Sequence, residues 1–140
     1  MRWGDEQTIR RLLRYDTWAV VGLSNDRGRA AYGVAAFLQR NGKRVVPVHP
    51  NESEVLGEKC YPSLAAVPFP VDVVDVFRRS EFAGAVADEA VETGAKAVWF
   101  QLGVIDEGAY ERVRAAGLDM VMDHCPKIEW SRHGPGERAA

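Results

Sequence analysis

The sequence predicts an α/β domain with three layers, in which about five mostly parallel strands lie between helices on both faces. Two observations lead to this prediction. Short apolar runs bounded by glycine or proline recur along the chain, and the first of them, TWAVVGL, does not alternate with polar residues, as is typical of strands buried on both faces. Helical patterns separate these runs, and strands that alternate with helices at this spacing form right-handed crossovers and a parallel sheet.

The predicted elements follow one another along the chain without an internal repeat. Each strand is a short apolar run, and each helix has apolar residues at helical spacing. The segment between the second and third strands is interrupted by proline and glycine, so it has at most one helical turn. In chain order, the elements are helix 5–14, strand 17–23, helix 30–40, strand 44–48, a turn around 63–67, strand 71–77, helix 81–92, strand 96–102, helix 107–116 and strand 118–123.

Local signals mark the ends of these helices. Residues with short polar side chains precede three of them and are suited to accept the first backbone N–H groups, namely Asp5 or Thr8, Ser80 and Asp106. Glycine follows three of the helices, as is typical of a helix end, at Asn41-Gly42, Thr93-Gly94 and Gly117.

Length and composition exclude several classes of protein. The 140 residues predict one domain, residues 1–140, with 131–140 as a frayed tail, and 46% apolar with 27% charged residues is typical of globular chains. No apolar run approaches the roughly 20 residues of a membrane span, so we expect a cytoplasmic protein without a membrane partner. The net charge of -2 gives no support to a nucleic-acid partner. Cys60 and Cys125 lack the spacing of metal ligands, so no metal site is predicted.

The loop after the first strand, VVGLSNDRGRAAYG, is a candidate ligand site. Ligands of Rossmann-like sheets bind beyond the carboxyl ends of the strands. Gly22, Ser24, Gly28 and Gly33 form a relaxed dinucleotide fingerprint, in which Gly22 suits the tight exit from the strand and Gly33 suits close helix packing. The Ser24 hydroxyl and the helix start near Arg29 predict a site for a phosphate or pyrophosphate. A purely structural glycine turn is the alternative.

The end of the second strand disfavours NAD. NAD-binding domains usually carry an Asp or Glu there, which holds the ribose hydroxyls. This strand ends in Val48-His49-Pro50, and Glu52 and Glu54 lie beyond a proline that bends the chain away. A phosphorylated ribose or a different adenylate is therefore favoured.

Five stretches, in their order and spacing, resemble the stand-alone CoA-binding proteins, single domains related to the N-terminal CoA-binding domain of the succinyl-CoA synthetase alpha subunit. They are AVVGLSNDRGRAAYGVAAFL, VVPVHPNESEVLGEKCYPSL, VDVVDVFR, GAKAVWFQLGV and AGLDMVMDHCPKIEW. The resemblance implies a Rossmann-like domain whose cofactor is coenzyme A or an acyl-CoA. The residues that it implies at the cofactor are Gly22, Ser24 and Arg29 for the phosphates, Val48, His49 and Pro50 beside the adenine and ribose, and Phe77 and Arg78 along the same cleft.

The other polar residues near strand ends predict no catalytic centre. His124 and Cys125 are adjacent in an extended segment and point to opposite sides, so Cys125 is better explained as a small apolar residue. Asp72 and Asp75 interrupt an apolar strand and need partners, at a sheet edge or among arginines. Gln101 ends the fourth strand, where it contacts either the amides of pantetheine or the loop backbone.

The favoured function is therefore a CoA or acyl-CoA binding module without catalysis of its own, acting alone, as a homodimer or with a protein partner. The synthetase uses a phosphorylated histidine that lies outside its CoA-binding domain, so the resemblance does not carry that chemistry. The alternatives are a small NAD(P)-dependent oxidoreductase, a partner subunit of an acyl-CoA ligase, and a scaffold that has lost its ligand.

Overall fold

The computed structural model describes residues 3–134, and a parallel sheet of five strands lies at their centre. The strand order is β2-β1-β5-β6-β7, and every neighbouring pair is parallel. Each strand lies inside a predicted segment, so the predicted α/β fold with a parallel sheet is confirmed. The strands are β1 (Thr17–Val21), β2 (Arg44–Val48), β5 (Val73–Val76), β6 (Ala97–Phe100) and β7 (Asp119–Val121).

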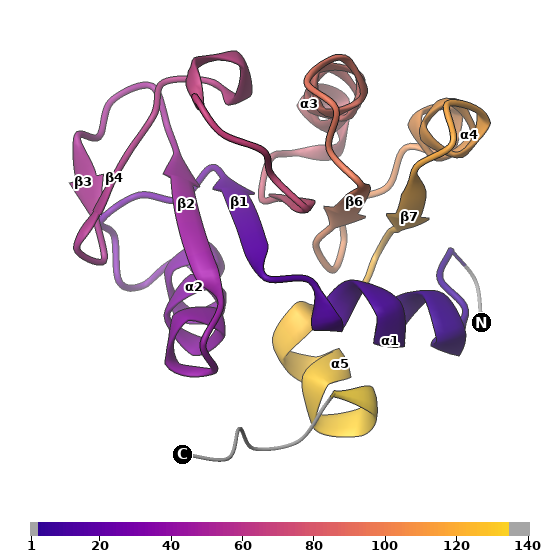
Figure 1. Cartoon of the computed structure of the whole chain (residues 1–140), viewed down its shortest axis with the longest axis horizontal. Coiled ribbons are helices and arrows are strands. Elements are labelled where there is room, and N and C mark those ends of the chain that lie inside the picture. Colours follow the sequence, from indigo (N-terminus) through magenta and orange to yellow (C-terminus); the bar gives the residue numbers. More distant parts are fainter. Residues whose placement is uncertain (1–2, 135–140) are drawn as a thin grey trace.

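Helices cover both faces of the sheet, with α3 and α4 on one face and α1, α2 and α5 on the other (Figure 1). The side chains of Asp5 and Asp106 cap α1 and α4, as predicted, by accepting the N–H groups of Thr8 and Ala109. None of the helices within residues 3–134 combines the length and the apolar character that a membrane crossing requires. The helices are α1 (Glu6–Arg14), α2 (Ala30–Arg40), α3 (Ser80–Glu92), α4 (Glu107–Ala115) and α5 (Pro126–His133).

Each face of the sheet has its own hydrophobic core. Under α1, α2 and α5, the rings of Trp18 and Trp99 are fully buried, with their centroids 5.8 Å apart. Truncating one such ring to alanine costs about 3–5 kcal/mol of stability. On the other face, small residues of α3 such as Ala83 and Ala87 pack in the same core as Phe100 of β6. The two cores hold the five strand ends in fixed positions relative to one another.

Two segments differ from the prediction. The strands β3 (Glu54–Val55) and β4 (Glu58–Lys59) form a short antiparallel hairpin, where the sequence shows mainly turn residues. Helix α5 includes the beginning of the segment that was predicted as a frayed tail, and the Trp130 ring packs edge-on against Phe37 at a centroid distance of 5.9 Å. The prediction of a frayed tail is therefore wrong for residues 131–133, and residues 135–140 lie outside the described residues.

Ser80 does not cap α3, contrary to the prediction. Arg79 occupies the N-cap position and forms no side-chain cap bond. The Ser80 hydroxyl instead accepts the N–H of Ile105 at 2.9 Å, in the loop that follows β6. The start of α3 is thus connected to that loop.

The two aspartates of the third predicted strand have different environments. Asp72 accepts the N–H of Thr17 at 3.0 Å and forms an ion pair with Lys96 at 3.1 Å. Partial burial alone would raise the pKa of Asp72, but these contacts outweigh it and hold the pKa below its usual value. Asp75 is fully buried in the central strand β5, and neither carboxyl oxygen has a hydrogen-bond partner among the described residues. The expectation of an edge position or an arginine partner is therefore wrong for Asp75.

Replacing Asp75 by asparagine is expected to stabilise the fold at neutral pH. Burial raises the pKa of Asp75 well above its ordinary value of 3.8. As pH rises from about 4, the unfolded chain loses this proton while the folded chain keeps it, so the wild type loses about 1.4 kcal/mol of unfolding free energy per pH unit until the folded pKa is reached. Asparagine has no such proton to lose.

Urea unfolding of both proteins between about pH 4 and pH 8 measures this difference. The stabilisation by Asp75→Asn should vanish near pH 4 and grow with pH. Parallel pH profiles of the two proteins would contradict the prediction.

Candidate functional site

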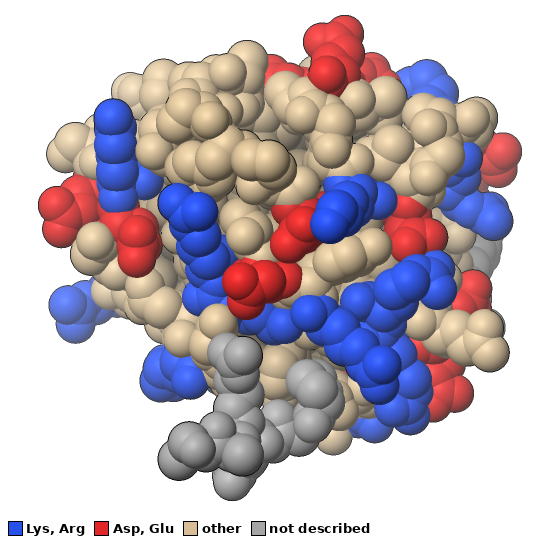
Figure 2. Space-filling model, viewed as in Figure 1, with Lys and Arg blue, Asp and Glu red and all other residues tan. Residues whose placement is uncertain are grey.

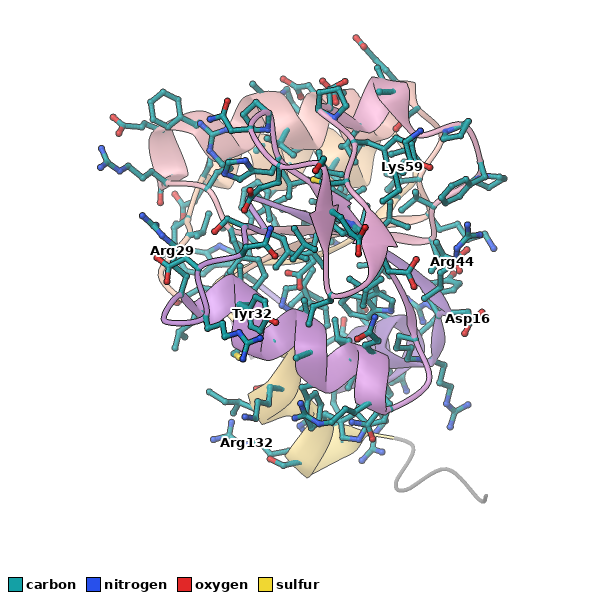
Figure 3. The ribbon with its side chains drawn as sticks, turned by 90° about the vertical axis from the view of Figure 1, so that its left-hand side faces the viewer. Asp16, Arg29, Tyr32, Arg44, Lys59 and Arg132 are labelled. Atoms are coloured by element: carbon teal, nitrogen blue, oxygen red, sulfur yellow. The ribbon has the colours of Figure 1, made fainter. Side chains whose placement is uncertain are left out.

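The order of the strands reverses between β1 and β5, and a crevice opens beyond the carboxyl ends of the strands at such a point. A cleft of about 760 Å³ lies there, which is within the usual range for small-molecule sites. Figure 3 shows Arg29 near the carboxyl ends of the strands, with Arg44 and Asp16 near their amino ends. The cleft, hereafter the first chamber, brings together all eight residues that were predicted at the site: Gly22, Ser24, Arg29, Val48, His49, Pro50, Phe77 and Arg78.

Gly22 brings the ends of three strands into contact. Its N–H donates to the carbonyl oxygen of Val48 at 2.9 Å, while the N–H of Phe77 donates to Val21 at the same distance. Its φ of +95° lies in the region that favours glycine, and a Cβ at this position would lie 2.7 Å from the carbonyl oxygen of Phe77. Both the backbone conformation and the close approach therefore require glycine.

Internal hydrogen bonds hold the loop after β1 in place. The Ser24 hydroxyl accepts the N–H of Asp26 at 3.2 Å, and the Asp26 carboxylate accepts the N–H of Gly28 at 3.0 Å. The same carboxylate lies 3.6 Å from the Arg29 guanidinium. Because Ser24 uses only its oxygen in this network, its O–H is available to donate into the chamber.

The chamber lacks the acidic residue that NAD sites use at the end of the second strand. Glu52 does not line it, because its carboxylate accepts the backbone N–H of Asn25 outside the chamber. His49 lines the chamber, and its Nδ1 accepts the N–H of Asn51 at 3.1 Å. A histidine that accepts at Nδ1 carries its proton on Nε2, so this nitrogen is a donor.

Two helices, α2 and α3, begin at the chamber without a side-chain cap. Arg29 and Arg79 occupy their N-cap positions, and both residues line the chamber. Helix α4 begins along the same edge of the sheet, but Asp106 caps it and does not line the chamber. The N–H groups of the first turns of α2 and α3, at the positive ends of the helix dipoles, are therefore suited to an anion.

The charged side chains that line the chamber also favour an anion. Three are arginines, Arg29, Arg78 and Arg79, and two are acids, Asp26 and Glu89. Asp26 pairs with Arg29, and Glu89 accepts a backbone N–H at 3.3 Å. Three positive charges against two negative ones leave one positive charge in excess.

The cleft continues toward the end of β6 as a second chamber of about 440 Å³. Gln101 lies on its wall and is only 9% exposed, and its buried Oε1 has no hydrogen-bond partner in the part of the chain that the structure describes. A buried acceptor of this kind requires a donor. The second chamber shares five lining residues with the first and adds Ala30, Ala31, Gln101 and Val104.

The loop that carries Gln101 and Val104 is held from both sides. The N–H of Gly103 donates to the Asp123 carboxylate at 2.7 Å, and the N–H of Ile105 donates to Ser80 at 2.9 Å. Asp123 has a φ of +62°, which is uncommon for a residue other than glycine. The wall of the second chamber is therefore fixed by residues from β7 and α3.

Several residues that line the first chamber do not follow a strand, so the expectation that ligands bind at strand ends does not identify them. They come from the segment around the short 3₁₀ helix η1 (Leu64–Ala66) and from the side of α3 that faces the chamber. The sequence around η1 shows only turn signals, so no pattern identifies these positions as lining a cleft. They are Pro62, Ser63, Leu64, Phe82, Val86 and Glu89.

The structure also tests the sequence-based interpretations of Cys125 and Gly33. Cys125 is 8% exposed and packs in a hydrophobic core, as predicted, while Nδ1 of the neighbouring His124 lies 2.7 Å from the carbonyl oxygen of Met122. Gly33 is exposed, and a Cβ there would have nothing within 4 Å. The prediction that Gly33 lets the helix pack closely is therefore wrong.

Comparisons with known proteins identify similar chains and a matching family. A family described as a CoA binding domain matches residues 16–131. The uncharacterized protein YneT of Bacillus subtilis is 41% identical over 117 residues, which cover 84% of this chain and 87% of YneT. A hypothetical protein of Pyrococcus horikoshii has a solved structure that matches with a TM-score of 0.87 and 37% identity, over 92% of each chain.

A longer protein also matches. The acetate–CoA ligase [ADP-forming] II of Archaeoglobus fulgidus is 32% identical over 111 residues. The match covers 74% of this chain and 16% of the ligase. The chain is thus similar to one part of that ligase.

Replacing Gly22 by alanine is expected to destabilise the protein more than the same change at Gly94. Both residues have a positive φ, of +95° and +81°, and a side chain in this region costs roughly 1–2 kcal/mol. A Cβ at Gly94 meets nothing within 4 Å, whereas one at Gly22 meets the backbone of Phe77. The free energies of unfolding of the two variants in urea give the comparison, and equal losses would contradict the close approach.

Proposed function

The chain belongs to the CoA-binding domain family, and from this premise we propose that it acts as a single domain that binds coenzyme A or an acyl-CoA in the cleft beyond β1, β2 and β5. The proposal rests on one observation: the eight predicted residues line a single chamber. Two helices without a side-chain cap begin at this chamber, and three arginines line it, two of which are among the eight. The proposal includes no catalytic step.

The diphosphate is placed at the loop after β1. The Ser24 hydroxyl and the first N–H groups of α2 donate to its oxygens, and Arg29 adds a charged donor. A hydrogen bond to a charged group contributes roughly 1.5–3 kcal/mol, so a few such bonds supply a large part of the about 8 kcal/mol that micromolar affinity requires. Gly22 lets the diphosphate approach the backbone, because no side chain stands at the exit of β1.

The adenine and ribose are placed beside the end of β2. Val48 and Pro50 offer apolar contact, and Nε2 of His49 is a donor to a ring nitrogen or a phosphate oxygen. Arg78, whose guanidinium lies 5.1 Å from the centre of the Phe82 ring, is suited to the 3′-phosphate of the ribose. No acidic side chain stands at the end of β2, where Val48, His49 and Pro50 lie, so a phosphorylated ribose meets no repulsion from this strand end.

The pantetheine arm is placed in the second chamber, which continues from the first. Ala30, Ala31 and Val104 offer apolar contact, and the side-chain amide of Gln101 is suited to bond the amides of pantetheine. The same arrangement accommodates a thioester at the end of the arm, so free CoA and an acyl-CoA both remain candidates.

A second candidate function is the supply of a CoA site to a ligase. The acetate–CoA ligase of Archaeoglobus fulgidus, to which this chain is similar, is much longer, and the chain matches 16% of it. A protein of this size would contribute CoA binding, and another chain would contribute the remaining chemistry. An NAD(P)-dependent oxidoreductase is not favoured, because Glu52 is held outside the chamber by its contact with Asn25.

Isothermal titration calorimetry with CoA, dephospho-CoA, NAD and ATP tests the proposal. We expect CoA to bind most tightly and dephospho-CoA to bind more weakly, because it lacks the 3′-phosphate. No heat of binding with CoA at millimolar concentration, or tighter binding of NAD than of CoA, would overturn the proposal.

Replacing Arg78 by alanine is expected to weaken CoA binding about five- to tenfold, as suits a charged hydrogen bond at an exposed position. Binding of dephospho-CoA should change much less. Arg14→Ala is the matched control, because it removes the same charge from the end of α1, just before β1 begins and away from both chambers. Figure 2 shows that basic side chains gather over α1, so the control removes a charge from a basic surface outside the chambers. If Arg14→Ala weakened CoA binding as much as Arg78→Ala, the effect would be one of general charge, and the prediction would be contradicted.

A further inference from the structure

Asp75 is a buried carboxyl group that no structural contact explains. Its side chain is 0% exposed, and within residues 3–134 both of its oxygens lack a hydrogen-bond partner. The other positions of β5 are valines, whereas Asp72 just before the strand has two N–H donors and a lysine. Replacing an unpartnered buried acid by an apolar residue normally stabilises a protein, so a residue of this kind points to a role in function.

Gln101 directly follows the neighbouring strand β6 and lies on the same face of the sheet as Asp75. The register pairs Val76 with Phe100, and the N–H of Gln101 donates to the carbonyl oxygen of Val76 at 3.2 Å. Side chains alternate along a strand, so Asp75 and Gln101 both face α2, while Val76 and Phe100 lie in the core under α3. Diagonal neighbours of this kind have Cα atoms about 7–8 Å apart, which two polar side chains can bridge.

The two groups are chemically complementary. A carboxyl group that burial keeps neutral has one O–H to donate, and the buried Oε1 of Gln101 is an acceptor without a partner. Only the Oε1 end of the Gln101 amide is buried and unpartnered, so its Nε2 end is the one free to donate into the second chamber.

We propose that Asp75 is a positioning residue: its neutral carboxyl group donates to Oε1 of Gln101 and so turns Nε2 toward a carbonyl oxygen of the ligand. That oxygen belongs to a pantetheine amide or to the thioester of an acyl-CoA, and this part of the proposal rests on the proposed function. The hydrogen bond between Asp75 and Gln101 forms when the two side chains rotate toward each other. The Nε2 group of Gln101 then favours ligands that carry a carbonyl group in the second chamber.

The proton on Asp75 controls the contact, because an ionised carboxylate has no proton to donate. Burial raises the pKa of Asp75, and no charged neighbour contributes to the shift. The titratable groups in the core on this face are the Cys60 and Cys125 thiols and the partly buried Tyr15 and Tyr32. The charged groups where α1 meets α5 pair with one another, namely Glu6 with Arg10 and Glu129 with Arg132, and the His133 ring lies beside Glu6.

Calorimetry with two ligands tests the inference. Adenosine 3′,5′-bisphosphate carries both phosphate positions without pantetheine, so it reports on the first chamber alone. We expect Gln101→Leu and Asp75→Val each to weaken CoA binding about five- to tenfold and to leave the bisphosphate unchanged, because one hydrogen bond is lost. The double variant should lose no more than either single one, and Asp75→Asn should restore affinity, because its amide also donates.

The pH dependence of CoA affinity gives a second readout. The wild type should lose affinity as Asp75 ionises, while Asp75→Asn should not show this loss. Losses that add in the double variant, or equal weakening of CoA and the bisphosphate, would overturn the inference. Urea unfolding shows whether Asp75→Val is folded, and Asp75→Asn serves as the test if it is not.

A measurement without ligand separates this inference from the proposed function. In NMR spectra of the free protein, the side-chain amide signals of Gln101 should shift with the titration of the Asp75 carboxyl carbon, and they should not do so in Asp75→Asn. Independent behaviour of the two groups would overturn the inference even if CoA binds. Failure of the wild type to bind CoA would overturn the proposed function instead.

Discussion

The contact between Gly22 and the carbonyl oxygen of Phe77 sets the geometry of the edge of the sheet at which the site lies. A parallel sheet sends every strand toward the same edge, but it does not by itself bring the loops together. Here the exit of β1 passes so close to the exit of β5 that no Cβ fits between them, and the N–H of Gly22 also reaches Val48 of β2. The two chambers, the arginines and the two helix starts all take their positions from this meeting point.

The residues at the starts of α2 and α3 are not those that would stabilise these helices most. An aspartate or serine at the start of α2 or α3 would cap the helix and contribute roughly 1 kcal/mol, as Asp5 and Asp106 do for α1 and α4. Arginine stands there instead at both helices. The same edge has a carboxyl group, Asp75, buried two residues before Phe77 without a partner. Positions that depart from the most stable choice thus lie close together, as is typical of a functional site.

The sequence predicts the five strands of the central sheet and most helices because their signals are local. An apolar run such as residues 17–23 has few alternatives to a buried strand, and glycine after a helix marks its end. The resemblance to the CoA-binding family implies the eight site residues, and most of them directly follow a strand, where ligands of such sheets bind. Ser80 was misassigned because a serine before a helix looks like a cap, whereas its hydroxyl contacts Ile105, 25 positions away. Phe82 and Glu89 line the chamber only because α3 packs beside β5, which the sequence pattern does not show. The lack of a partner for Asp75 depends on all the residues that surround it in the folded protein, so no local pattern predicts it.

The hairpin β3–β4 is tied to the loop after β1, since Asn25 donates its backbone N–H to Glu52 and its side-chain amide to the carbonyl oxygen of Glu54 at 2.8 Å. The loop after β1 and the segment that leads into β3 therefore support each other. A substitution that removes the side-chain amide of Asn25 would break the bond to Glu54, and its effect would reach from the loop after β1 to the hairpin.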